Sequence, residues 1–269
     1  MIEANNPSLK SWIKIEENSD FPIQNLPFGI YSTKNKSKRV GIAIGNQIID
    51  LYELANAGLL DSTDVSSDVF GSEFLNPFME LGKETTRKVR NRVSQLMRAS
   101  NTEIKGHDGL KKKVLDNESD ATMHLPVKIG DYTDFYSSKE HATNVGTMFR
   151  DPDNALLPNW LYIPVGYHGR ASSIITTEQA IVRPKGQQKP KDDEPPTFGP
   201  CKLLDFELEM AFITYNGKPL GESIDVDEAE DFMFGMCLFN DWSARDIQKW
   251  EYVPLGPFLA KNFASSMSP

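Results

Sequence analysis

The chain is organised around the stretch Asp131-Tyr-Thr-Asp-Phe-Tyr-Ser-Ser-Lys-Glu-His-Ala-Thr-Asn-Val-Gly-Thr-Met-Phe-Arg150. Its first six residues are mostly aromatic or Thr, which favours a strand. Two serines and a glutamate follow, and they indicate the start of a helix. Asp134 is therefore expected at the end of a strand and His141 in the first turns of a helix. This arrangement could place a metal ligand near a base, although a solvated turn with a capping serine is the alternative.

A second stretch, Leu203-Leu-Asp-Phe-Glu-Leu-Glu-Met-Ala-Phe-Ile-Thr-Tyr215, alternates between apolar and polar residues. On a strand, Asp205, Glu207 and Glu209 would share one face, at backbone spacings of about 6.6–6.8 Å. Three carboxylates in a row repel one another unless water or a cation lies between them. We therefore favour a bound cation over a polar face that simply meets solvent.

The apolar run Phe232-Met-Phe-Gly-Met-Cys-Leu-Phe239 predicts a strand that is buried on both faces. Asp241 follows at the mouth of that strand. Together with Asp134, Glu207 and Glu209 it makes four candidate oxygen ligands. Carboxylates suit Mg²⁺ or Ca²⁺ better than zinc, which prefers Cys and His.

A short helix is predicted directly after this strand, because a capping-box pattern follows it. Arg245, Gln248 and Tyr252 would then lie on one helix face. That face looks like a site for an anionic, oxygen-rich ligand, and an ordinary amphipathic helix is the alternative. Lys261 comes later and could help Arg245 to balance the carboxylates. His141 is the side chain best suited to act as a general base near neutral pH.

Two further segments lie between these stretches. The run from Asn159 to Arg170 predicts an extended segment that ends in a turn displaying Tyr167 and His168. Such residues can bind a ligand, and they can equally pack at the rim of a fold. Residues 183–200 are rich in Pro, Lys, Gln and Asp, which predicts a long surface loop.

Length and composition exclude several classes of protein. A chain of 269 residues favours two domains. The net charge of −9 argues against a nucleic-acid surface, which needs clustered Lys and Arg. We see no apolar run of the roughly 20 residues that span a bilayer, and no secretory signal at the start. Cys201 and Cys237 have no metal or redox spacing, so reduced thiols in a cytoplasmic protein are expected.

The N-terminal part predicts a small β-rich module with added helices. Residues 29–33 and 39–44 are β-prone, and Gly45-Asn46 predicts a hairpin turn. Residues 83–100 carry an apolar stripe at helical spacing. The highly charged segment 111–122 is expected to be a boundary or an exposed connection.

Taken together, these motifs resemble the fumarylacetoacetase (fumarylacetoacetate hydrolase) family over residues 21–269. The motifs that carry the resemblance are Asp131-Tyr-Thr-Asp-Phe-Tyr-Ser-Ser, His141-Ala-Thr-Asn-Val-Gly, Pro164-Val-Gly-Tyr-His-Gly-Arg170, Asp205-Phe-Glu-Leu-Glu209 and Asn240-Asp-Trp-Ser-Ala-Arg-Asp-Ile-Gln-Lys-Trp-Glu-Tyr-Val-Pro-Leu-Gly-Pro-Phe258.

The resemblance implies a fold that is mainly β, of the α+β class. An SH3-like barrel would occupy residues 1–122 and a β-sandwich roll would occupy residues 123–269. It also implies a cytoplasmic homodimer that hydrolyses the carbon–carbon bond of 4-fumarylacetoacetate to fumarate and acetoacetate. This reaction is the last step of tyrosine and phenylalanine breakdown.

The resemblance also assigns roles by position. Implied ligands of Ca²⁺ or Mg²⁺ are Asp134, Glu207, Glu209 and Asp241, with a second cation site at Asp241, Lys261 and Ser265. Implied substrate contacts are Tyr136, Arg150, Tyr167, Gln248 and Tyr252. Implied catalytic residues are the base His141 and the oxyanion donors Arg245, Gln248 and Lys261.

The chain departs from the family pattern in two places. Ser265 stands where the family has threonine, so a hydroxyl is kept. The family also continues for well over a hundred residues beyond Pro269, with a further substrate tyrosine and the glutamate that orients the histidine. The expectation is therefore a C-terminally truncated chain with weak or no activity. The alternatives are a hydrolase of acylpyruvates or other 1,3-dicarbonyl acids, and a non-catalytic metal-binding fragment.

Overall fold

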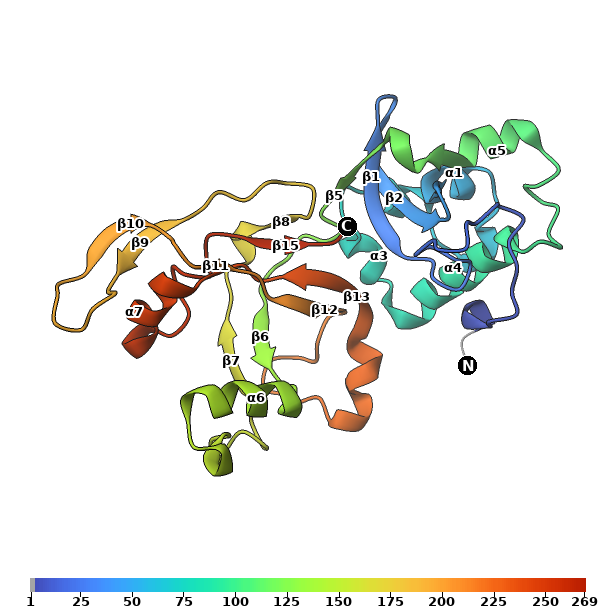
Figure 1. Cartoon of the computed structure of the whole chain (residues 1–269). Coiled ribbons are helices and arrows are strands. Elements are labelled where there is room, and N and C mark those ends of the chain that lie inside the picture. Colours follow the sequence, from blue (N-terminus) through green and yellow to red (C-terminus); the bar gives the residue numbers. More distant parts are fainter. Residues whose placement is uncertain (1–2) are drawn as a thin grey trace. The chain divides into compact units, whose positions relative to one another are not determined.

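The computed structural model describes residues 3–269 (Figure 1). Contacts divide the chain into two compact units. Unit 1 comprises Met1–Lys128, Met210–Leu238 and Met267–Pro269, and unit 2 comprises Ile129–Glu209 and Phe239–Ser266. Both contain sheets and helices, so the expected mainly β, α+β class is confirmed.

Unit 1 contains a five-stranded sheet in the order β4-β3-β2-β1-β5. The strands are β1 (Phe28–Thr33), β2 (Lys36–Ile44), β3 (Gln47–Asp50), β4 (Leu115–Asn117) and β5 (Ala121–His124). The predicted hairpin is present, since Ile44 pairs with Gln47 and Gly45 takes the left-handed φ of 57° that favours glycine. The ladders join the strands in one row, and among the described residues none joins β4 to β5 to close a barrel.

Helices add the rest of the core of unit 1. They are α1 (Leu51–Asn56), α2 (Ser67–Phe70), α3 (Asn76–Met79), α4 (Gly82–Met97) and α5 (Asp108–Val114). The apolar stripe predicted for α4 is confirmed, because Val89, Val93, Leu96 and Met97 are all fully buried. The charged segment 111–122 is mostly exposed, as expected, but it is neither a boundary nor a plain connection, because it lies within unit 1 and forms the end of α5 and then β4.

No helix in the described part of the chain is long and apolar enough to cross a membrane.

Unit 2 begins with the strand and helix predicted from the organising stretch. Strand β6 (Thr133–Tyr136) pairs with β7 (Val165–His168), and Asp134 lies opposite Tyr167. Helix α6 (Lys139–Phe149) follows at the end of this ladder (Figure 1). Its N-cap is Ser138, whose side chain accepts a hydrogen bond from the backbone of His141. The capping serine therefore orders the segment and leaves His141 in the first turn.

Unit 2 also contains two short antiparallel strand pairs and one more helix. Strand β11 (Leu204–Asp205) pairs with β14 (Ser243–Ala244), and helix α7 (Arg245–Leu255) follows directly. Residues 183–200 are not wholly a loop, because β9 (Lys185–Gln188) and β10 (Thr197–Pro200) form a hairpin.

The remaining strands form a four-stranded sheet in the order β12-β13-β15-β8. They are β12 (Leu208–Thr214), β13 (Met233–Asn240), β15 (Ser265–Met267) and β8 (Ile174–Thr176). The expectation that β13 is buried on both faces is wrong, since Met236 and Leu238 are 55% and 53% exposed. On β12 the apolar residues Leu208, Met210 and Phe212 are also exposed.

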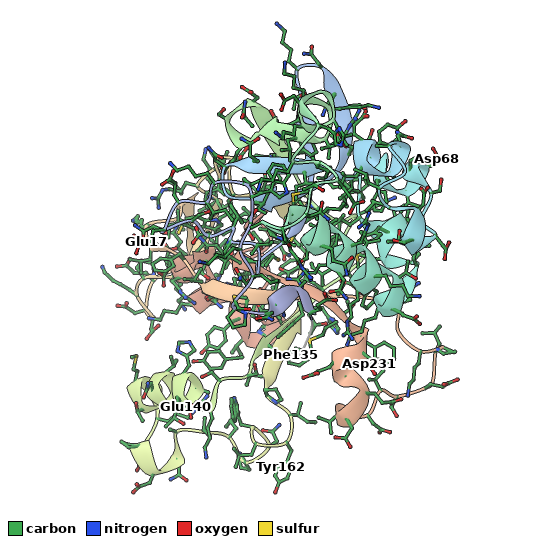
Figure 2. All side chains as sticks on the ribbon, turned by 90° about the vertical axis from the view of Figure 1, so that its right-hand side faces the viewer. Glu17, Asp68, Phe135, Glu140, Tyr162 and Asp231 are labelled. Carbon is green, nitrogen blue, oxygen red and sulfur yellow. The ribbon has the colours of Figure 1, made fainter. Side chains whose placement is uncertain are left out.

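Apolar side chains are exposed near β6 as well. Figure 2 labels Phe135 and Tyr162, whose side chains are 56% and 86% exposed. Strand alternation explains the first, because Asp134 and Phe135 must point to opposite faces of β6.

Candidate metal and catalytic site

Three carboxylates from separate segments of unit 2 meet in space. Asp134 lies on β6, Glu207 lies just before β12, and Asp241 follows β13. One oxygen from each lies within 4.8 Å of the others. Asp241 is fully buried and the other two are half-buried. The spacing suits oxygen ligands that share one divalent cation.

Lys261 provides the main positive charge beside these carboxylates. Its Nζ lies 2.6 Å from Glu207 Oε2 and 3.1 Å from Asp241 Oδ2, and its side chain is 3% exposed. It also donates to the Asp241 carbonyl and to Ser243 Oγ, at 2.9 and 2.6 Å. The ammonium therefore has four oxygen partners, which offset the cost of burying its charge.

Arg245 adds a second positive charge at the start of α7. Its guanidinium lies 2.9 Å from Glu207 Oε1 and 3.0 Å from Asp205 Oδ2. Burial raises the pKa of Glu207, but Lys261 and Arg245 outweigh it and hold that pKa below its ordinary value. Glu207 is thus an ionised carboxylate near neutral pH.

Unlike Glu207, Asp134 and Glu209 have raised pKa values. Burial, and then the charge of Asp241, raise the pKa of Asp134 to about 6. Burial, and then the charges of Asp134 and Asp241, raise the pKa of Glu209 to about 8. Glu209 is not one of the three residues whose oxygens converge, but it lies within the field of all three. Burial and the neighbouring carboxylates thus both disfavour the ionised forms of Asp134 and Glu209.

An unpaired oxygen indicates where a cation would fit. Asp134 Oδ2 is buried and has no hydrogen-bond partner among the described residues. A buried carboxylate oxygen without a partner is costly, and a divalent cation would satisfy it. The donor set of carboxylate oxygens suits Ca²⁺ or Mg²⁺ rather than zinc. The residues present therefore fit a hard divalent cation.

A second cation site is expected at Asp241, Lys261 and Ser265. Ser265 Oγ donates to Asp241 Oδ1 at 2.8 Å, so the hydroxyl does lie beside Asp241. The ammonium of Lys261 has no lone pair for a metal, so Lys261 could serve such a site only through its backbone carbonyl.

His141 and Tyr136 pack against each other at the start of α6. Their ring centroids are 4.9 Å apart, and Tyr136 Oη donates to the His141 carbonyl at 3.3 Å. Burial and the charge of Glu207 raise the pKa of Tyr136, which places this ring near the carboxylates. The His141 side chain is exposed, so water can reach it.

The other expected substrate contacts lie on three elements. Arg245 Nη1 donates to Gln248 Oε1 at 3.4 Å, so these residues share one face of α7, as predicted. Tyr252 lies further along α7 and is 54% exposed. Arg150, at the end of α6, donates to the Ala155 carbonyl at 2.9 Å. Tyr167, on β7, donates a hydrogen bond to Asp241 Oδ2.

Sequence reasoning missed the role of Ser243. The capping-box pattern predicts that Ser243 caps the helix, which is wrong, because Ala244 is the N-cap of α7 and no side chain caps it. Ser243 Oγ instead donates to Glu207 Oε1 at 2.9 Å and accepts from Lys261. The available signal was its spacing, because residues two apart in extended chain share a face and Ser243 follows Asp241 by two.

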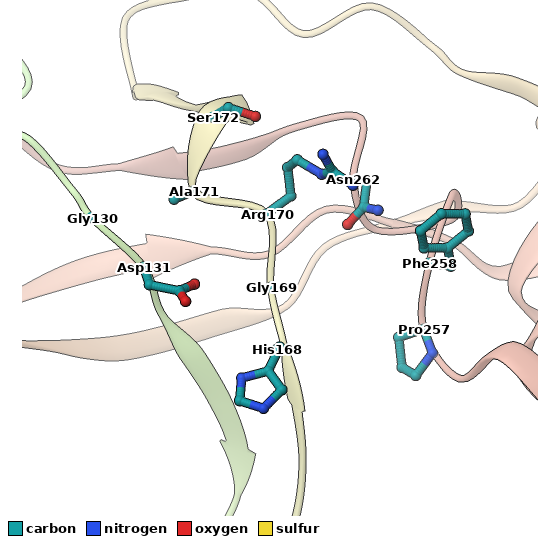
Figure 3. A pocket seen from close by; sticks show the side chains of 10 residues that line it. All are labelled: Gly130, Asp131, His168, Gly169, Arg170, Ala171, Ser172, Pro257, Phe258 and Asn262. Carbon is teal, nitrogen blue, oxygen red and sulfur yellow. The ribbon is translucent and has the colours of Figure 1, made fainter. Parts of the chain in front are cut away.

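A hollow of about 360 Å³ lies elsewhere in unit 2 (Figure 3). Its polar side chains include Asp131, His168, Arg170 and Asn262, with Phe258 as an apolar wall. In Figure 3 the Arg170 side chain extends toward Asn262. None of the carboxylates described above lines this hollow.

Comparisons with known proteins agree with these motifs. A family model described as "Fumarylacetoacetase N-terminal" matches residues 24–126, and one described as "Fumarylacetoacetate (FAA) hydrolase C-terminal" matches residues 131–269. The fumarylacetoacetase of Homo sapiens is 52% identical over 260 residues, covering 96% of this chain and 62% of that protein. The fumarylacetoacetase of Caenorhabditis elegans is 54% identical, covering 97% of this chain and 63% of that protein.

The fumarylacetoacetase of Dictyostelium discoideum is 53% identical and covers 97% of this chain. The chain thus spans a little over three-fifths of the length of these curated relatives. A solved structure, the fumarylacetoacetate hydrolase of Exiguobacterium antarcticum, is 15% identical and aligns with a TM-score of 0.45. That alignment covers 89% of this chain and 62% of that one.

Proposed function

Because the chain belongs to the fumarylacetoacetate hydrolase family, we propose that its site serves the hydrolysis of 4-fumarylacetoacetate to fumarate and acetoacetate. The observation that carries the proposal is the convergence of Asp134, Glu207 and Asp241 beside Lys261. These residues lie in a chain about half identical to proteins named fumarylacetoacetase.

Asp134, Glu207, Glu209 and Asp241 would hold the cation, Ca²⁺ or Mg²⁺. When bound, such an ion supplies Lewis-acid polarisation of the two keto oxygens of a diketone. The buried, unpaired Oδ2 of Asp134 supports this assignment.

The side chains of this chain would then carry the proton and charge steps. His141 takes one proton from water, and the oxygen of that water forms a bond to the carbonyl carbon of the fumaroyl group. The carbon–carbon bond breaks, and its electron pair leaves with the acetoacetate fragment as an enolate. The proton held by His141 then goes to the methylene carbon of this enolate, which becomes the methyl group of acetoacetate, so one water is consumed and two acids are released.

Cationic and amide donors would stabilise the charge that develops on oxygen. Arg245 and Lys261 both contact Glu207, and Gln248 accepts a hydrogen bond from Arg245. Donors fixed in place before reaction are the effective ones. Arg150, Tyr136, Tyr167 and Tyr252 would seat the carboxylate ends of the substrate. The proposal includes a cytoplasmic homodimer acting on this soluble dicarboxylate, as the family resemblance implies.

The test is the loss of fumarylacetoacetate, followed by ultraviolet absorbance, with purified protein and added Ca²⁺ or Mg²⁺. We expect His141→Ala to remove turnover and leave cation binding intact, and Asp134→Asn to weaken both. The matched control is His107→Ala, because His107 is an exposed histidine of unit 1. Turnover that survives His141→Ala would overturn the assignment of the base.

A substrate panel separates the remaining alternatives. Faster turnover of an acylpyruvate than of fumarylacetoacetate would favour the alternative, a hydrolase of acylpyruvates. Tight cation binding, with no turnover of any 1,3-dicarbonyl acid, would favour the other alternative, a non-catalytic metal-binding fragment, and keep the metal site.

A further inference from the structure

Glu251 is a buried carboxylate with no role in the steps above. It lies on α7, the helix that carries Arg245 and Gln248, and it is only 8% exposed. Burying a carboxylate is costly unless hydrogen bonds compensate for the lost water. The partners of Glu251 therefore indicate what its charge is used for.

Those partners are three consecutive backbone amides. Glu251 Oε1 accepts from the N–H groups of Phe258 and Ala260 at 3.0 and 2.8 Å, and Oε2 accepts from that of Leu259 at 3.1 Å. Hydrogen bonds to an ionised acceptor are stronger than neutral ones. One side chain thus fixes the backbone of a segment that belongs to no helix or strand.

The fixed segment leads directly into Lys261. The Ala260 carbonyl accepts from the N–H of Ala244 at 2.9 Å, and the N–H of Lys261 donates to the Phe258 carbonyl at 3.0 Å. Gly256 allows the chain to turn back toward α7, because its φ of 73° lies in the region that favours glycine. The backbone on both sides of the Lys261 stem is therefore held in place.

Position matters for Lys261 because its stem is long and flexible. A lysine side chain has four rotatable bonds, and its ammonium is a compact charge with no fixed direction of its own. Here that ammonium lies 2.6 Å from Glu207 and 3.1 Å from Asp241. A backbone held by Glu251 restricts the conformations from which this flexible stem can reach the two carboxylates.

We propose that Glu251 is a positioning residue: by holding the amides of residues 258–260, it places the Lys261 ammonium among the carboxylates. Only the catalytic consequence of this placement rests on the proposed function. Glu251 also ties Lys261 to the helix that carries Arg245 and Gln248, so the three oxyanion donors keep one geometry.

The direct test measures the amides and the amine, and it needs no substrate. In the wild type, hydrogen exchange of Phe258, Leu259 and Ala260 should be slow, and acylation of Lys261 should lag behind that of the exposed Lys249. In Glu251→Gln we expect both to become at least ~10-fold faster, since bonds to a charged acceptor are lost. Fast exchange of these three amides in the wild type would already overturn the proposal.

Two controls separate positioning from general loosening. Ile247→Val removes one methyl from the buried core on the same helix. It should lower thermal stability while exchange at residues 258–260 and acylation of Lys261 stay unchanged. Glu178→Gln removes the charge of an exposed glutamate in unit 2 and should change nothing. If Ile247→Val accelerates acylation of Lys261 as much as Glu251→Gln does, the effect is general and the proposal fails.

A double-mutant cycle tests the catalytic consequence. If Glu251 acts through Lys261, Glu251→Gln should lower kcat in the wild type and cause no further loss in Lys261→Met. Equal losses in both backgrounds would overturn the proposal. If the proposed reaction is wrong and there is no turnover to measure, amide exchange and lysine acylation still decide the role of Glu251. Should Glu251→Gln fail to fold, Glu251→Asp, which withdraws the carboxylate by one methylene, takes its place.

Discussion

Replacing Lys261 with methionine should expose how strongly the carboxylates depend on its charge. Methionine keeps most of the volume of the side chain and removes the ammonium, which is 3% exposed and contacts Glu207 and Asp241. Removing one partner of a buried ion pair costs about 3–5 kcal/mol, because the remaining charges stay buried and unpaired. We therefore expect a loss of about 3–5 kcal/mol of stability in unit 2, at pH 7.5 and in the presence of EDTA.

Unfolding in urea, followed by tryptophan fluorescence, measures this loss. Three of the four tryptophans, Trp160, Trp242 and Trp250, belong to unit 2, so the signal reports mainly on that unit. Lys249→Met is the matched control because Lys249 is exposed on α7, and it should change stability by less than about 0.5 kcal/mol.

Two conditions sharpen the test. Saturating Ca²⁺ should raise the stability of the Lys261→Met protein by about 2.7 kcal/mol at a hundred times Kd, because the bound ion supplies positive charge to the same carboxylates. Lowering the pH should narrow the gap between the two proteins. Pairing holds the pKa of Glu207 below its ordinary value of 4.5, so its contribution is present above that pH and disappears as pH falls. A Lys261→Met protein as stable as the wild type in EDTA would refute the reasoning.

Three further results are expected. With EDTA, the melting temperature should fall as pH rises from about 5 to about 8, because the raised pKa of Glu209 favours its neutral form and ionisation removes that stability. Glu209→Gln should make the melting temperature depend less on pH, and it should reduce the number of protons released when Ca²⁺ binds. An unchanged pH dependence of the melting temperature would contradict the raised pKa of Glu209. Gly41→Ala should cost about 1–3 kcal/mol, because a Cβ there would lie 2.6 Å from a methyl of Ile48. By contrast, Gly109→Ala on α5 should be neutral or stabilising, because a Cβ there would have nothing within 4 Å. If urea unfolding shows Gly109→Ala to be less stable than Gly41→Ala, the packing described for unit 1 is wrong. Burial raises the pKa of Cys201 and Cys237 to about 11, so at pH 8 only about 0.1% is thiolate and iodoacetamide should label them far more slowly than in urea. Equal labelling rates in the two solutions would show that neither thiol is buried.

Local patterns predicted the elements that carry the site. The aromatic run and the serine pair correctly indicated a strand and a helix that place Asp134 and His141 on consecutive elements. Helical spacing correctly put Arg245 and Gln248 on one face of α7. These predictions succeeded because each depends on residues close together in the chain, where backbone geometry alone fixes direction.

Features set by distant packing were not predictable in this way. The apolar run of β13 is compatible with burial on both faces, and the sequence does not reveal which neighbours cover it. The β9 hairpin has almost no β-branched residues, so nothing in its sequence indicates a strand. Contacts across the chain stabilise it, because the Gln188 side chain donates to the Gly199 and Pro200 carbonyls and Gly186 lies against Ile247.

The exposed apolar side of β12 has a consequence for how the protein behaves in concentrated solution. β12 is an edge strand, and Leu208, Met210 and Phe212 on one side of it are 72%, 51% and 55% exposed. An edge strand with apolar side chains is a template on which further chains can stack. Repulsion between molecules of net charge −9 opposes that stacking at neutral pH. Concentrated samples should therefore aggregate least at low salt and well above pH 5. They should aggregate and scatter light when acid or salt weakens the repulsion between molecules.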